Sequence, residues 1–472
     1  MRFLITTHAD PRFMPRTFID PDEIVAGPYY NNVKKDGRIR FMGTPGGEIL
    51  FKDTWDRIPE GQKPDVLLVH ADVTCGCLPV GLPSGLPRFL LVGDTHHMDA
   101  PISKMLRYAL QERFNAVFVW NRNVAHFFKE AGIPHVFWMP GLIMGVPPVP
   151  VQDKRRVELA FFGQAGKYHP RRIRLLDAIK ESGIPLFSRP MPRLMGLERF
   201  AGSLMAFNAS LNGEINMRIF EASSTGAMIL TDRLSPQHGL EKFYKDGESM
   251  VSYGSEAELV EKARYYIKHP QEAMQIGLRG KEVYEKHFTT QARRDAFMAI
   301  VQGGAANPDF LLADEPRCRL KPAASEAELK ALFTRIAFYE WLQELHRVDE
   351  RLSVDVITAA SAPLFVSDIC DLYRLDIRLK GPALQMRKEL EPVFKAFGAQ
   401  VQCDSPELSG GTVLLADAQS LDEPAVMALV GKKYSAVFMA RMDEASRPAC
   451  DKVFADIGMV PSQKVPGLYE NA

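Results

Sequence analysis

The chain has 472 residues, which is too long for one ordinary domain and predicts two or three domains, each with its own hydrophobic core. Hydrophobic residues make up 46% of the sequence and charged residues 25%, proportions typical of a soluble globular protein. The 58 basic residues balance the 58 acidic ones, so net charge does not draw the protein to nucleic acid or to an anionic membrane.

The opening sequence, MRFLITTHADPRF, lacks the long apolar core and the cleavage site of a secretory signal. Apolar runs fall short of the roughly 18 residues that a membrane-spanning helix needs. The six cysteines are scattered apart from Cys75 and Cys77, and no second pair offers zinc ligands at matching spacing. We therefore expect a cytoplasmic protein with reduced cysteines, no metal and no integral membrane segment.

Short apolar runs alternate with helical patterns over residues 1–150, as in a Rossmann-like domain with a parallel sheet and crossover helices. The segment 20–46 is rich in proline, glycine and asparagine, and we predict a long loop there. The predicted strands cover residues 3–6, 65–69, 89–92, 116–120 and 136–138, and the predicted helices cover 49–58, 101–113 and 124–131.

The turn GDTHHMD follows the predicted strand RFLLV. In open parallel sheets ligands bind beyond the carboxyl ends of the strands, which places Asp94, His96 and His97 where catalysis normally occurs. Histidine has a pKa suited to proton transfer near neutral pH, and an adjacent acid can orient it. The alternative is a loop whose polar residues cap the next helix beside two solvated histidines. We take these three residues as candidate catalytic residues.

A proline-rich and then charged stretch, residues 145–156, is predicted to link the first domain to a second one. The second domain begins with a strand at 158–162, and the loop GQAGKYHPRR leads from that strand into a helix. Backbone amides of a glycine turn can approach a phosphate, and Lys167, Arg171 and Arg172 would supply the opposing charge. A solvated basic start of a helix is the alternative.

The stretch NMRIFEASSTGAMILTD is predicted to be a helix that runs into a buried strand. Asn216 is a suitable N-cap, and Glu221 lies on the first turns of the helix, ahead of a run of small residues. A carboxylate there can accept hydrogen bonds from both hydroxyls of a ribose, while Arg218 helps to balance a diphosphate. A capped amphipathic helix with a surface glutamate is the alternative.

Taken in order, these motifs resemble a known family. N-x-R-x-F-E-A-x-x-x-G-A, a buried strand, GLEKFYKDGESMVSYGSEAELVEKARYYIKHP and EKHFTTQARRD are similar to the C-terminal half of CgeB-like (spore maturation) glycosyltransferases of the GT-B fold. The resemblance covers residues 157–301. Related retaining enzymes carry two glutamates separated by seven residues. Glu221 matches the second, whereas the position of the first is Gly213, with Glu214 next to it.

The resemblance implies an α/β protein with two Rossmann-like domains in the GT-B arrangement and a closing helix that returns to the N-terminal domain. Such enzymes move a sugar from a nucleotide-sugar donor to an acceptor in the interdomain cleft, with no cofactor and no metal. The turn with His96 would face the acceptor, whose identity stays open, as does inversion or retention of the sugar. The resemblance implies that the donor is bound by Gly163, Lys167, Arg171, Arg172, Asn216, Arg218 and Glu221.

Two other functions fit the same fold. The first is a nucleotide-sugar epimerase or hydrolase, which needs no acceptor. The second is a non-catalytic protein that binds nucleotide sugars, and the glycine at position 213 favours it.

The rest of the chain is predicted to add a smaller α/β unit. Residues 306–350 contain a linker and a long amphipathic helix, and residues 351–472 form an accessory domain for acceptor binding or assembly. Homo-oligomerisation through this region stays open. The donor-binding domain would then span residues 151–305. The predicted strands of the accessory domain, at 354–358, 377–379, 400–403, 412–416 and 436–439, alternate with helices, as in a methyltransferase-like Rossmann unit without its Gly-rich cofactor turn.

Overall fold

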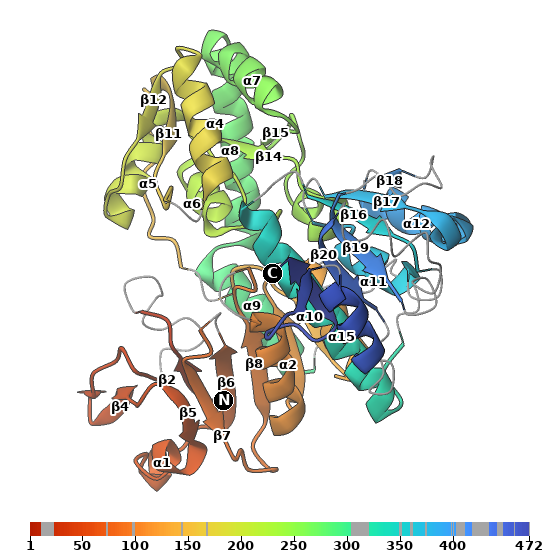
Figure 1. Cartoon of the computed structure of the whole chain (residues 1–472). Coiled ribbons are helices and arrows are strands. Elements are labelled where there is room, and N and C mark those ends of the chain that lie inside the picture. The colour runs from red at the N-terminus through yellow and green to blue at the C-terminus, as the bar shows by residue number, and fades with distance from the viewer. Residues whose placement is uncertain are drawn as a thin grey trace. The chain divides into compact units, whose positions relative to one another are not determined.

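The structure of the protein is a computed structural model of mixed α/β class, as predicted (Figure 1). It describes residues 1–10, 23–71, 74–96, 100–142, 145–166, 169–303, 321–348, 352–358, 362–372, 375–397, 399, 401–402, 411–417, 434–440, 447–456 and 458–471. The chain divides into two compact units. The first comprises Met1–Phe128, Ile133–Leu234 and His238–Ala313, and the second comprises Lys129–Gly132, Ser235–Gln237 and Asp314–Ala472. In these described ranges, no helix has the length and apolar composition needed to cross a membrane.

An eight-stranded sheet forms the N-terminal lobe of the first unit, in the order β10-β9-β8-β6-β1-β2-β4-β3. All neighbours are parallel except β3 and β4. Its central strands are buried on both faces and are therefore almost wholly apolar. The strands are β1 (Phe3–Thr7), β2 (Ile24–Gly27), β3 (Val33–Lys35), β4 (Arg38–Gly43), β6 (Val66–Ala71), β8 (Arg88–Val92), β9 (Ala116–Val119) and β10 (Val136–Trp138), and the helices are α2 (Pro101–Glu112) and α3 (Ala125–Glu130).

The prediction of a long loop over residues 20–46 is wrong, because strands β2, β3 and β4 lie within this segment. Asp36 and Gly37 join β3 to β4 with φ angles of 52° and 75°. Two consecutive residues at positive φ form the tight hairpin turn for which Asp-Gly is a known sequence signal. Asp36 and Gly37 therefore belong to a tight turn between two strands and not to a long loop. The helix predicted at 49–58 is shorter in the structure, where α1 covers only Phe51–Trp55. The preceding residues, Gly47–Leu50, form strand β5, which pairs with β7 (Cys77–Val80).

The second lobe of the first unit contains a five-stranded, all-parallel sheet in the order β12-β11-β13-β14-β15. A continuous apolar core fills the space between this sheet and its helices, with Leu175, Met228 and Leu259 among its members. The strands are β11 (Arg156–Phe161), β12 (Leu186–Ser188), β13 (Ser203–Phe207), β14 (Met228–Asp232) and β15 (Val251–Tyr253), and the helices are α4 (Pro170–Glu181), α5 (Arg193–Ala201), α6 (Met217–Thr225), α7 (Glu256–Lys268) and α8 (Pro270–His287).

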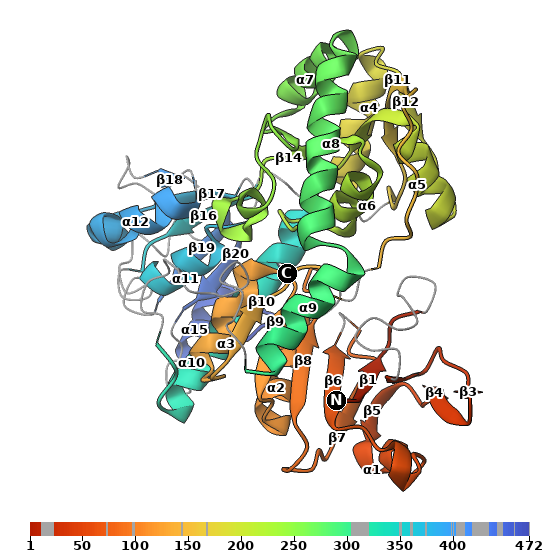
Figure 2. The same ribbon diagram turned by 180° about the vertical axis from the view of Figure 1, so that it is seen from behind.

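Helix α9 (Thr290–Val301) follows α8 along the chain, as Figure 2 shows. Its Phe297 is fully buried against aromatic rings of the N-terminal sheet. The ring centroid lies 6.0 Å from that of Phe3, 6.2 Å from that of Phe89 and 5.0 Å from that of Phe118. The prediction of a closing helix that returns to the N-terminal lobe is confirmed.

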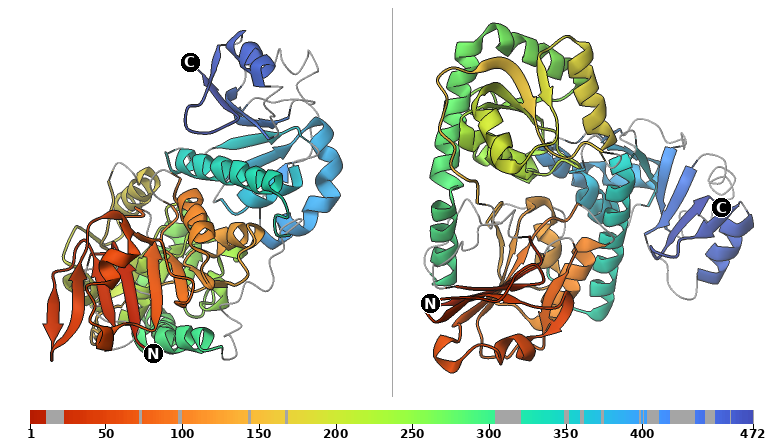
Figure 3. Two further views of the ribbon diagram at one scale, coloured as in Figure 1. Left: turned by 90° about the horizontal axis from the view of Figure 1, so that it is seen from below. Right: turned by 90° about the vertical axis from the view of Figure 1, so that its left-hand side faces the viewer.

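The second unit contains a seven-stranded sheet in the order β18-β17-β16-β19-β20-β22-β21, in which β22 is antiparallel to both neighbours. The long predicted helix is α10 (Glu326–Val348), and Figure 3 shows it beside this sheet. Phe338 of α10 lies 4.4 Å from Phe438 of β20, between ring centroids. The remaining elements are β16 (Ser353–Val356), β17 (Asp376–Leu379), β18 (Val401–Gln402), β19 (Gly411–Ala416), β20 (Tyr434–Met439), β21 (Met459–Pro461), β22 (Leu468–Asn471), α11 (Ala362–Ile369), α12 (Arg387–Phe397) and α15 (Arg447–Asp456).

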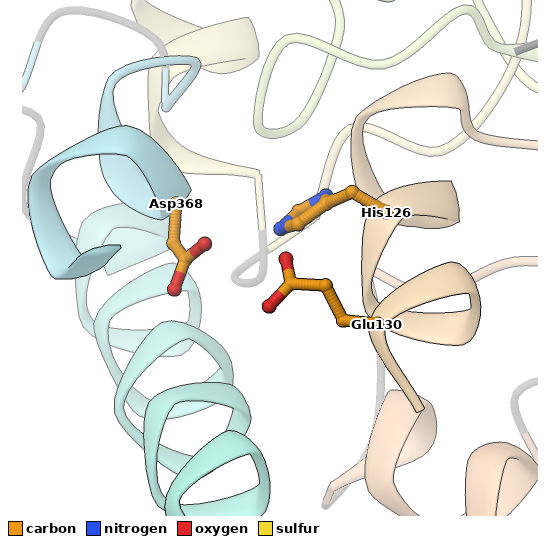
Figure 4. Close-up of side chains that lie close together, drawn as sticks. All are labelled: His126, Glu130 and Asp368. Atoms are coloured by element: carbon orange, nitrogen blue, oxygen red, sulfur yellow. The ribbon is translucent and has the colours of Figure 1, made fainter. Parts of the chain in front are cut away.

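A buried arginine joins three parts of the second unit. Arg335 of α10 donates from Nη1 to Glu130 Oε2 at 2.7 Å and from Nε to Asp368 Oδ2 at 2.7 Å. Figure 4 shows the carboxylates of Glu130 and Asp368 facing one another from α3 and α11. Burial alone would lower the pKa of the Arg335 guanidinium, but the carboxylates of Asp368 and Glu130 hold it above its usual value. A metal ion at these two carboxylates would have to displace this guanidinium.

Replacing Arg335 by Met should leave both carboxylates buried without their cation. We expect the second unit to lose about 3–5 kcal/mol of stability, measured as the free energy of unfolding in urea by circular dichroism. Arg447→Met is the control, because it removes an exposed ion pair with Asp451 from the same unit and should cost less than about 1 kcal/mol. Equal losses in the two variants would contradict the assigned role of Arg335.

Candidate active site

The order of the strands reverses at the centre of the second lobe. Strand β11 has β12 on one side and β13 on the other, so two loops flank the reversal at the carboxyl edge of the sheet. These loops are residues 162–164, after β11, and residues 208–210, after β13. Ligands of open parallel sheets bind outside this edge at such a reversal. The candidate site is therefore built from these two loops and from the helices that follow them.

Arg218 of α6 joins the two loops. Its Nε donates to the carbonyl of Phe162 at 3.1 Å, and its Nη1 donates to the side-chain oxygen of Asn208 at 2.8 Å. The guanidinium also lies over the ring of Phe161, 4.6 Å from the centroid. Burial lowers the pKa of Arg218 to about 9, so the group still carries its proton at neutral pH. A fixed positive charge therefore lies at the reversal of the sheet.

Gly163 makes room for this guanidinium. Its φ of +140° is one that residues with a side chain rarely adopt, and a Cβ there would lie 2.3 Å from Nη2 of Arg218. The glycine predicted to open a phosphate turn is thus required by the close approach of Arg218 to the backbone.

Arg172 joins the same two loops from α4. Its Nη1 donates to the carbonyl of Gln164 at 2.6 Å, and its Nη2 donates to the carbonyl of Ala209 at 2.8 Å. Arg171, next to it, donates to Asp232 Oδ2 at 2.9 Å. Both arginines are buried, so the alternative of a solvated basic helix start is excluded.

The buried charges at this edge do not cancel. Arg171, Arg172 and Arg218 carry three positive charges, while Asp232 and Glu214 carry two negative ones, which leaves one net positive charge among these five groups. Burial would raise the pKa of Asp232, but its ion pair with Arg171 and its hydrogen bonds from Ser210 hold it below its usual value. The excess positive charge favours an anion at the carboxyl edge.

Glu214 closes the loop between β13 and α6. Its carboxylate accepts hydrogen bonds from the backbone N–H groups of Leu211 and Asn212, both at 2.8 Å. Gly213, at the position of the family's first glutamate, has a φ of +92°. Glu214 therefore stabilises its own loop, and these contacts account for an acid one position after the expected one.

Helix α6 begins as predicted. The side-chain oxygen of Asn216 accepts a hydrogen bond from the backbone N–H of Arg218 at 3.1 Å, which makes Asn216 the N-cap. Glu221 lies in the second turn and is buried, so the alternative of a surface glutamate is excluded. Its Oε1 accepts a hydrogen bond from Nε of Arg193, the first residue of α5, at 2.8 Å.

The carboxylate of Glu221 can accept more than one hydrogen bond. A carboxylate offers about four lone-pair positions, so the hydrogen bond from Arg193 occupies one of them and two hydroxyl groups could use others. Burial raises the pKa of Glu221, and the positive charges of Arg193 and Arg218 partly offset that rise. Arg193 therefore helps to keep this buried carboxyl group ionised.

The predicted catalytic turn lies beyond β8 of the N-terminal lobe. Asp94 Oδ1 accepts a hydrogen bond from the backbone N–H of His96 at 2.8 Å, so Asp94 orders the turn. Thr95 Oγ1 accepts from Asn121 Nδ2 at 3.1 Å. His96 is buried, which excludes the alternative of a solvated histidine at this position. His97, together with Lys167 of the phosphate loop, lies outside the described residues.

Several residues of the site were missed from the sequence. Asn208 directly follows the buried strand β13, and Asp232 is the last residue of the adjacent strand β14. A polar residue at the carboxyl end of a buried parallel strand is a sequence pattern that indicates a site, and it could have identified both. Arg193 had no such signal, because it lies 28 residues before its partner Glu221 on another helix.

A broad groove of about 760 Å³ lies elsewhere on the second lobe, between α4 and α7. None of the predicted site residues that the structure describes lines it. Its walls carry Glu181, Glu256, Arg264 and Tyr265. We assign the chemistry to the carboxyl edge of the sheet, where the buried charges lie.

Comparison with known proteins identifies the second lobe. Residues 172–299 match a family model described as Glycosyl transferase-like. These residues form a glycosyltransferase-like domain. The matched range includes α4 from Arg172 onward and the whole of α6 with Arg218 and Glu221, so the prediction of a glycosyltransferase is confirmed at this level. No curated protein matches the sequence.

Several solved structures resemble this chain at low similarity. Anabaena HepE in complex with UDP and glucose is 11% identical, with a TM-score of 0.45 over 64% of this chain and 100% of that chain. TarM of S. aureus, in complex with UDP among other ligands, is 9% identical, with a TM-score of 0.40 over 51% of this chain and 57% of that one. An α-glucosyltransferase bound to UDP-glucose and DNA is 11% identical, with a TM-score of 0.41 over 64% and 99%.

Gly163→Ala should force the strained backbone and the Arg218 guanidinium apart. We expect a loss of about 1–3 kcal/mol in the free energy of unfolding, measured in urea. Gly166→Ala in the same loop is the matched control, because a Cβ there meets nothing within 4 Å, and it should change stability by less than about 0.5 kcal/mol. An unchanged free energy of unfolding in Gly163→Ala would show that Arg218 is not held against this glycine.

Arg193→Gln should leave Glu221 buried without its ion pair, at a cost of up to about 3 kcal/mol at neutral pH. The loss should shrink as the pH falls, because without Arg193 the already raised pKa of Glu221 rises further and its carboxyl group becomes neutral at a higher pH than in the wild type. Urea unfolding at several pH values measures it. Arg189→Gln, an exposed neighbour of α5, should show a small deficit that does not vary with pH. A pH-independent loss in Arg193→Gln would contradict the pairing.

Proposed function

We propose that the protein is a glycosyltransferase that moves a sugar from a nucleotide-sugar donor to a hydroxyl-bearing acceptor. The observation that carries the proposal is the pair of buried guanidiniums, Arg172 and Arg218, that flank the reversal of the sheet in a glycosyltransferase-like domain. A net positive charge at the end of parallel strands suits a diphosphate.

The donor residues divide into two groups. The backbone turn at Gly163 and the start of α6, capped by Asn216, would present N–H groups to the diphosphate, with Arg171, Arg172, Arg218 and Lys167 supplying positive charge. Glu221 would accept hydrogen bonds from the two ribose hydroxyls.

The reaction breaks the bond between the anomeric carbon and the diphosphate oxygen and forms one from that carbon to the acceptor oxygen. The nucleoside diphosphate leaves with increased negative charge, which the buried guanidiniums would stabilise without having to move. The acceptor hydroxyl loses its proton. His96, His97 and Asp94 remain our candidates for the acceptor side, with His96 the one whose ring would take or share that proton.

The finer assignments rest on resemblance. The ordered motifs of residues 157–301 support a CgeB-like subtype and a reaction without metal or cofactor. The scattered cysteines support a cytoplasmic location. Residues 351–472 would serve as an accessory domain for the acceptor or for self-association. The acceptor would be a polysaccharide, a protein or a small molecule.

One observation favours a second function. Glu214 is tied to its own loop and Gly213 offers no side chain, so the acid expected to contact the sugar is absent from its usual place. A protein that binds nucleotide sugars without turning them over fits that loss. Incubation with UDP-, GDP- and dTDP-sugars separates these functions. A transferase releases free nucleotide when an acceptor is added, a hydrolase or epimerase yields free nucleotide or an isomer without an acceptor, and a binding protein binds the sugar nucleotide without turnover.

Glu221→Gln tests the donor site directly. A thermal-shift screen over UDP, GDP, dTDP and CMP first finds the nucleotide, since a ligand of the native state raises the melting temperature. Calorimetry with that nucleotide should then show affinity at least about tenfold weaker in Glu221→Gln, because hydrogen bonds to a charged acceptor are lost.

The control variant is Glu198→Gln, an exposed glutamate of α5, which should bind as the wild type does. The control ligand is the 2′,3′-dideoxy nucleotide, for which wild type and Glu221→Gln should have equal affinity. If the ribose form also binds equally to both, Glu221 does not hold the ribose.

A further inference from the structure

Three neighbouring strands of the N-terminal sheet, β6, β1 and β2, end beside one another. The order of strands reverses between β1 and β6, so this carboxyl edge is the N-terminal counterpart of the donor edge in the second lobe. The tripeptide H-A-D occurs at the end of both strands, directly after β1 at residues 8–10 and across the end of β6 at residues 70–72. The proposed function does not yet use these residues.

The reversal is held by a polar pair inside an apolar core. Thr7 and His70 are register partners on β1 and β6, and Thr7 Oγ1 lies 2.9 Å from His70 Nδ1. Thr7 Oγ1 also accepts the backbone N–H of Ala9 at 3.0 Å. Both side chains are buried, so the pair fixes the direction in which the chain leaves β1. The next residue in the chain is His8.

The turn after β6 is shaped around the ring of His8. Its Nδ1 lies 2.9 Å from Thr74 Oγ1, which also accepts the backbone N–H of Gly76. A Cβ on Gly76 would lie 2.3 Å from the imidazole ring. Cys75, between them, has a φ of 48°, which is strained for a residue with a side chain. Strain of this kind is retained where the surroundings over-determine it, and it clusters at functional sites.

Tyr29 follows β2 and completes the group. Its ring centroid lies 5.0 Å from that of His8 at an interplanar angle of 61°, and the side chain is 53% exposed. His8 is itself partly exposed. An oriented imidazole thus lies beside an exposed aromatic face at the edge of a parallel sheet. A sugar ring is complementary to both, because it has an apolar C–H face and polar hydroxyls.

We propose that His8 and Tyr29 form an acceptor subsite for a sugar ring, which rests on the proposed glycosyltransferase function. The ring of Tyr29 packs against the C–H face of the acceptor, and the imidazole of His8 hydrogen-bonds one of its hydroxyls. Thr7, His70, Thr74 and Gly76 are positioning residues that fix the imidazole. The acceptor is then a saccharide rather than a protein side chain.

A solely structural role would explain one part of this arrangement. A histidine that only filled the turn would need neither an exposed aromatic neighbour nor a strained residue in the turn that surrounds it. The two interpretations differ in what they predict for catalysis. A structural role links His8 to stability, whereas a subsite links His8 and Tyr29 to the acceptor alone.

The test compares His8→Gln and Tyr29→Ala with the wild type, using the donor that the nucleotide screen selects. The acceptor probes are the methyl glycosides of glucose, galactose, mannose and N-acetylglucosamine, and water serves as the competing acceptor. Each variant should raise KM for the glycoside about tenfold or more, with nucleotide affinity and the rate of donor hydrolysis within about twofold of the wild type.

The second lobe provides a matched control. His269 and Tyr265 of the α7 region form another exposed tyrosine–histidine pair, with ring centroids 4.1 Å apart. His269→Gln and Tyr265→Ala should leave KM unchanged.

Unchanged KM in both subsite variants would overturn the inference, as would nucleotide affinity that falls in parallel with transfer. A wild type that hydrolyses donor but uses none of the glycosides also counts against it, because the subsite is assigned to a sugar. A wild type that binds no nucleotide at all refutes the proposed function instead.

Discussion

Two buried guanidiniums hold together the carboxyl edge of the sheet in the second lobe. Arg172 and Arg218 approach from different helices and each bonds one group of the loop after β11 and one of the loop after β13. Arg172 donates to two backbone carbonyls, and Arg218 donates to one carbonyl and one side-chain amide. Because these acceptors are neutral, the hydrogen bonds that orient the two guanidiniums do not neutralise their positive charges. The same contacts therefore fix the positions of the two loops and place positive charge between them. The glycine turn and the position of α6 follow from this arrangement.

Much of the fold was accessible from hydrophobic periodicity. Buried parallel strands such as β1, β11 and β14 are apolar runs bounded by turn residues, and the long helix α10 has one apolar face. The hairpin of β3 and β4 was not predicted because β3 is a short, exposed strand with two lysines, and the apolar residues of β4 are interrupted by arginines. The pairing of Arg193 with Glu221 could not be predicted either, because a contact between two helices depends on how they pack and leaves no local pattern in the sequence.

The three larger sheets are bridged at the same topological place. Thr7 and His70 join β1 to β6, the two arginines join the loops after β11 and β13, and Thr358 donates a hydrogen bond to Asp417 where β16 and β19 end. Loops that diverge at a reversal have no ladder partner, so a side chain has to supply the missing bond. At each of these places a polar residue lies at or just past the end of an apolar strand: Thr7 and His70, Asn208, and Thr358 and Asp417. His8 follows β1 directly and is of the same kind.

The ion pair of Arg335 joins residues that are synthesised at very different times. Glu130 precedes Arg335 by 205 residues, and its buried carboxylate is paired with that guanidinium, which also binds Asp368. At synthesis rates of 5–20 residues per second, Glu130 emerges on the order of 10–40 s before its partner. During that interval the end of α3 cannot reach its final environment. The second unit is therefore completed only after translation has passed α11, however early the N-terminal sheet folds.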